Sequence, residues 1–360
     1  MVHENKEINE KVNRIRSLLD GQNKKAMLIT EQPNFSWLTG GGRGFLGLAS
    51  TKACASVLVT KQRLYLLANN IEGERLMQEE NLSGFCELVK LPWQEDGELD
   101  RLAGQMADGS LVYDFRMEKE LAAFRQQLCA EEQERYRTLC RDAAGGMEDA
   151  IRTFYPEISE FEAAGRIAAA LWKGGMEPIS LFVAADDRVG ECRHFIPTDK
   201  RAGRQIIASI CARRGGLVAS VTRTAAFGTP SETLGKYYGL LLEVEAKGWD
   251  ALCTQPDLGH VYQKICEAYA KRGMNGEWQN HHQGGLTGYK PREIRMDERT
   301  TKEIRAGQAF AFNPSCNAAK VEDTVLLTDS GIEVMSIPGK DWPVLEAGSY
   351  CMPDILRLGG

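Results

Sequence analysis

A pair of apolar, β-branched runs separated by two glycines constrains the fold of this chain more than any other feature. Residues 205–212 (QIIASICA) and 217–227 (LVASVTRTAAF) lie on either side of the sequence RRGG. Two such runs around a short glycine-containing segment are typical of a β-hairpin. With the turn centred on the middle two residues of RRGG, Ser209 and Ser220 are predicted to be directly opposed cross-strand partners.

A second hairpin is predicted further along the chain. Residues 308–313 (QAFAFN) and 320–327 (KVEDTVLL) flank a turn near residues 317–318. This register pairs Asn313 with Glu322 on strands that are otherwise apolar. A carboxylate on such a strand is costly unless it is paired or functional, so Glu322 becomes a candidate site residue.

Two adjacent histidines, His281 and His282, lie between the two hairpins in the sequence HHQGG. Neighbouring residues on a strand point to opposite faces, so only one of the two is expected to face a pocket. A third histidine, His194, begins a polar loop after a buried strand, where a rigid scaffold commonly places binding residues. Imidazole titrates near neutral pH, which makes these side chains candidate acid–base groups.

The length of the chain, 360 residues, is long for a single core, so two domains are expected. Residues 1–125 combine a hairpin at residues 53–68 with helical segments, which predicts a small α/β domain. Residues 126–360 alternate helices, such as the one at residues 159–172, with the two antiparallel hairpins. The fold class is therefore α/β (α+β), and the second domain is predicted to be a curved antiparallel sheet flanked by helices.

The overall composition limits the partners. A net charge of −6 at pH 7 argues against nucleic acid, because phosphate binding requires a concentrated basic surface. No apolar run approaches the length of a membrane span, and the N-terminal sequence MVHENKEINEKVNRI is polar, so no membrane association is expected. The ten cysteines lack the spacing of a disulfide framework or a zinc site, which favours the reducing cytoplasm.

Four motifs now give the chain a family resemblance. They are VTRTAAFG at residues 221–228, HQGGL at 282–286, FNP at 312–314 and VEDTVLLT at 321–328. In this order they resemble the aminopeptidase P, prolidase and creatinase family, the M24 peptidase-like proteins of the pita-bread fold. Residues 26–40 resemble the opening of that family's N-terminal domain, and residues 193–198 resemble its substrate-binding histidine segment. The resemblance implies a creatinase/prolidase-like domain at 1–125, a pita-bread catalytic domain at 126–360 and a homodimer.

The resemblance also implies a changed metal site. Metallopeptidases of this family hold two divalent ions with two aspartates, one histidine and two glutamates. These positions fall on Ser209, Ser220, His282, Asn313 and Glu322. One carboxylate and one imidazole do not supply the anionic oxygens that two hard cations need, so neither a metal nor another cofactor is expected. The family's second histidine, seven residues after the metal ligand, falls on Tyr289.

The same resemblance implies roles for the remaining residues. His194 is expected to act as general acid and base and His282 as a second proton donor, while Glu322 and Asn313 position the substrate. Arg43 would bind a substrate carboxylate in the partner subunit's site, as an arginine does in creatinase-like dimers. The other expected substrate-binding residues are Ser209, Ser220, Arg223 and Tyr289, although Arg223 could instead pair with Glu322 or Asp323, and Tyr289 and Arg292 could be loop surface.

The resulting hypothesis is a metal-independent hydrolase, similar to creatinase, that cleaves a C–N bond in a small molecule or short peptide. One alternative is an inactive pseudo-peptidase that binds a peptide or protein. A second alternative is an Xaa-Pro aminopeptidase with an atypical metal site. Fold resemblance does not choose among these, because one fold supports many activities.

Overall fold

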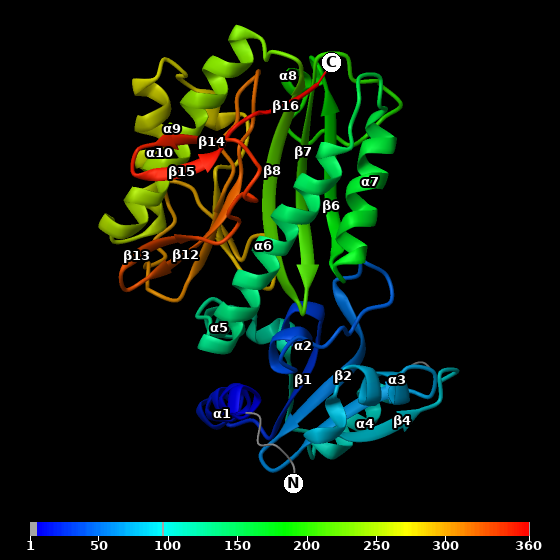
Figure 1. The fold of residues 1–360 in the computed structure, drawn as a ribbon. Coiled ribbons are helices and arrows are strands. Elements are labelled where there is room, and N and C mark those ends of the chain that lie inside the picture. The colour runs from blue at the N-terminus through cyan, green and yellow to red at the C-terminus, as the bar shows by residue number, and fades with distance from the viewer. Residues whose placement is uncertain (1–5, 96, 360) are drawn as a thin grey trace. The chain divides into compact units, whose positions relative to one another are not determined.

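The computed structural model describes residues 6–95 and 97–359, and it divides into two compact units. The first unit contains the chain up to Glu132 together with Gly215–Leu217, and the second contains 133–214 and 218–360. Within the described residues, none of the helices combines the length and the hydrophobicity that crossing a membrane requires. Figure 1 shows the helices and strands of both units as a ribbon.

The first unit is built on a five-stranded mixed sheet of order β4-β3-β2-β1-β5. Its strands are β1 (Ala26–Glu31), β2 (Lys52–Thr60), β3 (Leu64–Asn69), β4 (Glu87–Leu91) and β5 (Leu111–Tyr113). Its helices are α1 (Lys6–Gly21), α2 (Gln32–Leu38), α3 (Gly73–Glu79), α4 (Glu98–Met106) and α5 (Glu118–Arg125), with 3-10 turns η1 (Leu82–Gly84) and η2 (Asp114–Met117). β2 and β3 form the antiparallel hairpin expected at residues 53–68.

The second unit contains a four-stranded sheet, β16-β8-β7-β6, and a five-stranded sheet, β10-β9-β11-β12-β13. The first is formed by β6 (Glu177–Ala185), β7 (Gln205–Arg214), β8 (Leu217–Phe227) and β16 (Leu356–Leu358). The second is formed by β9 (Gly284–Thr287), β10 (Ile294–Arg295), β11 (Ala309–Phe312), β12 (Asp323–Thr328) and β13 (Gly331–Val334). A small hairpin of β14 (Val344–Ala347) and β15 (Tyr350–Pro353) follows them.

Helices cover these sheets. They are α6 (Ala130–Arg152), α7 (Glu160–Lys173), α8 (Arg188–Glu191), α9 (Glu232–Thr254) and α10 (Leu258–Lys271), with the 3-10 turn η3 (Glu277–Gln279). α7 packs against β6, and α9 packs against α10, β13 and β14 (Figure 1). A large hydrophobic core of this unit lies beneath α9 and α10, where Trp249 is buried together with Leu286 and Phe312. The mixed α/β class and the sheet flanked by helices are confirmed.

The β7–β8 hairpin turns at its glycine pair. Gly215 and Gly216 have φ of 57° and 77°, the left-handed region that both central residues of a type I′ turn must adopt. Side-chain contacts accordingly join Ser209 Oγ to Thr222 Oγ1 at 2.8 Å and Ser220 Oγ to Cys211 Sγ at 3.6 Å. The predicted pairing of Ser209 with Ser220 is therefore wrong, because it placed the turn one residue too early.

The second hairpin has the predicted register. β11 and β12 pair Phe312 with Asp323, and a bridge further along pairs Ser315 with Lys320. Both pairs belong to the register that was expected to set Asn313 opposite Glu322. A further antiparallel bridge, between Thr222 and Glu322, joins this hairpin to β8. The polar residues of the two hairpins are thereby brought to one place.

Candidate functional site

Glu322 is the centre of the polar cluster between the two hairpins. Its carboxylate accepts hydrogen bonds from Arg292 Nη2 at 2.6 Å, Lys320 Nζ at 2.9 Å, Ser209 Oγ at 3.1 Å and Thr222 Oγ1 at 3.3 Å. The backbone N–H of Thr222 also donates to the Glu322 carbonyl. The carboxylate is thus fixed by neighbours on β7 and β8, on the segment before β12 and on the loop that carries Arg292.

The two cations of this cluster also bind the two serines. Lys320 Nζ donates to Ser209 Oγ at 2.6 Å, and Arg292 Nη1 donates to Ser220 Oγ at 3.1 Å. The side chains of Lys320, Arg292 and Glu322 are only 5%, 7% and 5% exposed. Burial alone would raise the pKa of Glu322, but Lys320 and then Arg292 outweigh it and hold that pKa well below its usual range. The carboxyl is therefore ionised at neutral pH.

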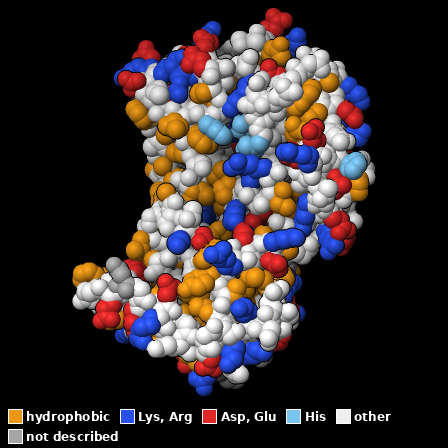
Figure 2. All heavy atoms as spheres, turned by 180° about the vertical axis from the view of Figure 1, so that it is seen from behind, with side chains coloured by type: hydrophobic (Ala, Val, Ile, Leu, Met, Phe, Trp, Pro, Cys, Tyr) orange, Lys and Arg blue, Asp and Glu red, His pale blue; other side chains and the backbone are white. Residues whose placement is uncertain are grey.

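Three histidines lie together beside this cluster. The Nε2 atoms of His194 and His281 are 3.1 Å apart, and the rings of His281 and His282 stack with centroids 4.3 Å apart. Figure 2 shows histidine side chains gathered next to several Lys and Arg side chains on one face. The expectation that adjacent histidines would face opposite ways is wrong, since β9 begins only at Gly284 and the two histidines precede it in irregular backbone.

The surroundings keep all three imidazoles neutral at pH 7. Burial, followed by the charge of Lys320, lowers the pKa of His281 to about 3. Burial, followed by the charge of Arg292, lowers the pKa of His282 to about 4. The pKa of His194 is lowered by the same two kinds of cause, burial first and Lys320 second. Each ring therefore offers one N–H donor and one nitrogen acceptor.

The glycines after the histidines allow close backbone approach. Gly284 has φ of 98°, and a Cβ there would lie 2.1 Å from the Ala311 carbonyl oxygen. Gly285 has φ of 145°, and a Cβ there would lie 2.1 Å from the Ile294 carbonyl oxygen. β9 can pair with β11 and β10 on its two sides only because neither residue carries a side chain.

Comparison with known proteins places this geometry in a family. The family model for metallopeptidase family M24 matches residues 134–329, more than half of the chain. The chain belongs to metallopeptidase family M24. The predicted resemblance to the prolidase and aminopeptidase P proteins is thereby confirmed.

Some distant relatives match this M24 chain over nearly its full length. The Xaa-Pro dipeptidase of Pyrococcus horikoshii is 23% identical over 350 residues, covering 90% of this chain and 96% of that protein. The structure of an Xaa-Pro dipeptidase from Bacillus anthracis matches with a TM-score of 0.71 at 18% identity, covering 93% and 99% of the two chains. The N-terminal domain of the FACT complex subunit SPT16 from chickpea matches with a TM-score of 0.68 at 14% identity, covering 92% and 97%. The structural matches establish the pita-bread fold.

The side chains of this M24 chain do not fit the metal pair that the family name implies. Glu322 is the one carboxylate among the five positions that the family resemblance assigns to metal ligands, and its two oxygens already bind Lys320 and Arg292. Ser209 and Ser220 offer neutral oxygens, and each accepts a hydrogen bond from one of the same cations. The ammonium and guanidinium groups thus occupy the oxygen atoms that would bind metal, and their positive charges would repel a divalent ion.

Two other groups in the described residues have the spacing of metal ligands. The nitrogens of His194, His281 and His282 lie within 4.8 Å of one another, and the charges of Lys320 and Arg292 that act on these imidazoles would repel a metal ion there. In the first unit, Glu7, Cys129 and Glu132 form a similar group. There, Lys11 Nζ already donates to Glu7 and Glu132 at 2.6 and 2.7 Å.

The remaining predicted site residues differ in how deeply they are buried. Asn313 is 3% exposed, and its Oδ1 has no hydrogen-bond partner among the residues that the structure describes. Tyr289 is 1% exposed, so its side chain is interior and not loop surface. Arg43 is half-exposed in the first unit, where it pairs with Glu80.

Arg223 was expected to bind substrate, and the structure corrects that expectation. Its side chain is fully buried and donates to Glu148 Oε1 at 2.8 Å and to Asp323 Oδ1 at 3.0 Å. It also donates to the carbonyls of Thr222 and Ser336. Every nitrogen of the guanidinium is therefore used inside the protein, as in the alternative in which it pairs with Asp323. Arg223 supports the β8–β12 contact and does not face a ligand.

Two contacts of Glu322, with Lys320 and with Arg292, were not predicted from the sequence. A signal for Lys320 was available, because residues two apart on an extended strand face the same side, and Lys320 is two residues before Glu322. Arg292 lies in the loop between β9 and β10, where no periodicity predicts the direction of a side chain.

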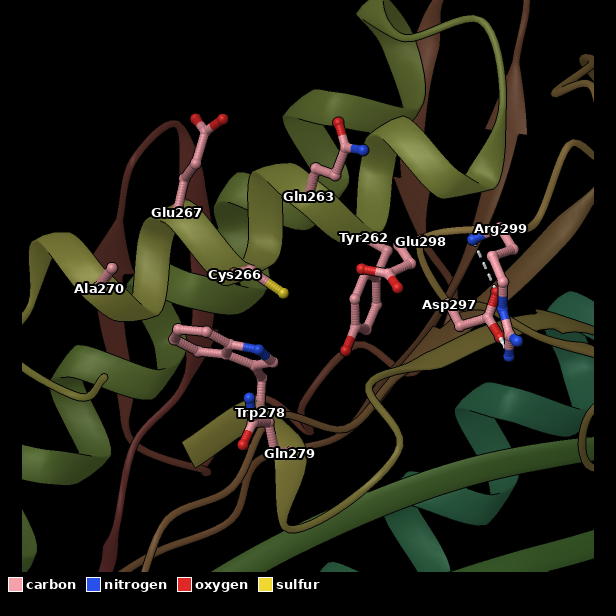
Figure 3. A pocket seen from close by; sticks show the side chains of 10 residues that line it. All are labelled: Tyr262, Gln263, Cys266, Glu267, Ala270, Trp278, Gln279, Asp297, Glu298 and Arg299. Carbon is pink, nitrogen blue, oxygen red and sulfur yellow. Dashed lines mark hydrogen bonds and ion pairs between the residues drawn. The ribbon is translucent and has the colours of Figure 1, made fainter. Parts of the chain in front are cut away.

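The surface of this unit also carries a separate cavity of about 660 Å³ (Figure 3). Tyr262 and Cys266 of α10 project toward it, and Trp278 of η3 forms another wall. Asp297, which pairs with Arg299, lies at its edge. None of the predicted site residues lines this cavity, so it is not the candidate catalytic site.

Proposed function

We propose that this protein is a metal-independent hydrolase that cleaves a C–N bond in a small molecule or short peptide. The observation that carries the proposal is the position of Lys320 and Arg292, which bind the one carboxylate retained from the aligned metal ligands. The positive charge that metal ions bring to related sites is here attached to the chain. Catalysis then depends on general acid–base chemistry and on substrate orientation.

The proposed proton-transfer group is His194. It is the most exposed of the three imidazoles, so water and substrate can reach it, and its Nε2 lies 3.1 Å from Nε2 of His281. His194 takes a proton from the attacking water and returns it to the leaving nitrogen, while His281 holds the ring by a hydrogen bond. His282, stacked on His281, acts as the second proton donor.

Glu322 has a different role in this proposal from the one expected from sequence. Its carboxylate accepts four hydrogen bonds from protein groups. It therefore acts as a positioning residue that holds Lys320 and Arg292, and it does not itself hold the substrate. Asn313 has an unpaired side-chain oxygen, which can accept a hydrogen bond from an N–H group of the substrate.

The domain roles and assembly complete the proposal. Catalysis is assigned to the second unit, because it contains the histidines and the Glu322 cluster, and residues 1–125 are assigned as the creatinase-like N-terminal domain. The protein is proposed to be a cytoplasmic homodimer in which Arg43 reaches the partner's site. Its ten cysteines are all free thiols, which accords with a reducing compartment.

Chelator-treated protein tests the proposal. Calorimetric titration with Mn²⁺, Co²⁺ and Zn²⁺ should show no tight binding, and turnover on a panel of amide, amidine and guanidino compounds should be unaffected by the chelator. His194→Ala should lower kcat by about 10²–10⁴-fold with an unchanged fold. Tight uptake of two ions per chain would overturn metal independence. Peptide binding without any turnover would favour the inactive pseudo-peptidase.

A further inference from the structure

The charges of the Glu322 cluster do not balance. Lys320 and Arg292 contribute two positive charges, and Glu322 contributes one negative charge. Neither cation forms an ion pair with a second carboxylate among the residues that the structure describes. All three side chains are at most 7% exposed, and an uncompensated charge at such a depth is unfavourable. A single negative charge from a ligand would complete the balance.

The same two cations have unused donors. Arg292 Nε is buried and has no hydrogen-bond partner within the described part of the chain. Lys320 Nζ carries three N–H groups and makes two hydrogen bonds, to Ser209 Oγ and Glu322 Oε2. Buried donors are normally satisfied, and donors on charged groups prefer ionised acceptors. The unused donors and the local excess of positive charge therefore favour an anionic acceptor.

We propose that the substrate carries one carboxylate, which Lys320 and Arg292 bind in place of the partner's Arg43, and that it presents its C–N bond to the neighbouring histidine pair. This inference rests on the proposed hydrolase function and names the substrate class, a small monoanionic amide, amidine or guanidino acid. A monoanion matches the net charge of +1, whereas a phosphate dianion would leave an unbalanced negative charge. Asn313 Oδ1, the unpaired acceptor in register with Glu322, accepts the N–H beside the scissile bond.

Two ligands of nearly equal shape test the anion requirement. N-acetylglycine carries a carboxylate, and N-acetylglycinamide replaces it with a neutral amide. Calorimetry on the full-length protein should show N-acetylglycine binding at least about tenfold more tightly, as expected for a charge-assisted hydrogen bond. Acetate separates a substrate site from a site for free anions. If acetate binds as tightly as N-acetylglycine, or the two glycine derivatives bind equally, the substrate assignment is overturned.

Variants locate the binding. Lys320→Met should lower the affinity for N-acetylglycine by about tenfold or more and leave the amide unaffected. Arg292→Gln should act in the same direction, and it carries the test if Lys320→Met does not fold. Lys264→Met removes the same charge from an exposed residue that pairs with Glu267, and it should change nothing. An unchanged affinity in both site variants would place the anion elsewhere and overturn the proposal.

The histidine variant separates this inference from the proposed function. His194→Ala should retain the preference for N-acetylglycine even where it abolishes turnover, because it leaves Lys320 and Arg292 unchanged. Carboxylate binding without turnover in the wild-type protein would leave the anion site standing and overturn the hydrolase. Turnover without any preference for anionic substrates would support the hydrolase and overturn the anion site.

Discussion

Lys320 Nζ and Arg292 Nη2 bind opposite oxygens of Glu322, at 2.9 Å from Oε2 and 2.6 Å from Oε1. One carboxylate therefore holds two cations in a buried site. Removing it would leave two like charges facing each other without compensation, which makes Glu322 the residue on which this arrangement depends.

Glu322→Gln should destabilise the protein by about 3–5 kcal/mol, the usual effect of breaking a buried ion pair from one side. Urea unfolding at neutral pH measures this. Glu298→Gln, at an exposed residue near Arg299, is the matched control and should stay within about 0.5 kcal/mol of wild type. A Glu322→Gln protein as stable as the control would show that the cations do not need the carboxylate.

The stabilisation from Glu322 should depend on pH in a definite direction. Its pKa in the folded protein is depressed, so the stabilisation is present above the ordinary value of 4.5 and is lost as the pH falls toward the folded pKa. Unfolding free energies measured from neutral pH into acid should fall more steeply for wild type than for Glu322→Gln. Parallel curves for the two proteins would contradict the depressed pKa.

Glu245 should show the opposite dependence. Burial, and then the charge of Asp323, raises its pKa far above 4.5, while its Oε1 accepts the Asp323 backbone N–H at 3.0 Å. Wild type therefore loses stability as the pH rises above 4.5, where the unfolded chain ionises but the folded carboxyl does not. Glu245→Gln keeps the acceptor and removes this loss, so its stability relative to wild type should grow with pH. A constant difference in unfolding free energy between the two proteins at all pH values would contradict the raised pKa of Glu245.

The imidazoles should remain neutral across the physiological range. NMR titration of wild type should show no protonation of His281 or His282 between about pH 5 and pH 8, where an unperturbed histidine titrates. Lys320→Met removes the second-largest cause of the lowered pKa of His281, so that pKa should rise. An unmoved His281 signal would mean that Lys320 does not act on it.

Gly284 and Gly235 should respond in opposite ways to alanine. Gly284→Ala places a Cβ against the Ala311 carbonyl oxygen at positive φ, and it should destabilise by at least about 1–3 kcal/mol. Gly235, inside α9 with open space around it, should gain about 0.5–1 kcal/mol on the same change. Thermal unfolding of both variants decides the matter, and similar shifts in the two would contradict the close approach of β9 and β11.

Sequence patterns predicted most of the fold and part of the site. The β11–β12 register followed from alternation and one turn, so Asn313 and Glu322 were placed correctly opposite each other. The β7–β8 register failed because four candidate turn residues allow more than one centre, and the backbone preference of the glycine pair decides between them. Strand geometry allowed only one of His281 and His282 to face the pocket, yet both lie in irregular backbone, whose side-chain directions no period determines.

The site charges depended on contacts between distant segments. Arg292 reaches Glu322 and Ser220 from a loop, and this follows from the packing of β9 against β11 rather than from any local pattern. Arg223 is a second example. It lies beside site residues in the sequence, and nothing there indicated that it would donate a hydrogen bond to Glu148 on α6.

The hydrogen bonds of Lys320 to Ser209 and Glu322 have a consequence for how the protein matures. An ammonium group is synthesised with the chain, so its position is reached when the two hairpins close, without a separate loading step. Every folded copy then has the same charge at this position, whatever the supply of trace metals in its surroundings. In the proposed metal-independent hydrolase, starvation for manganese, cobalt or zinc would leave this site unaltered.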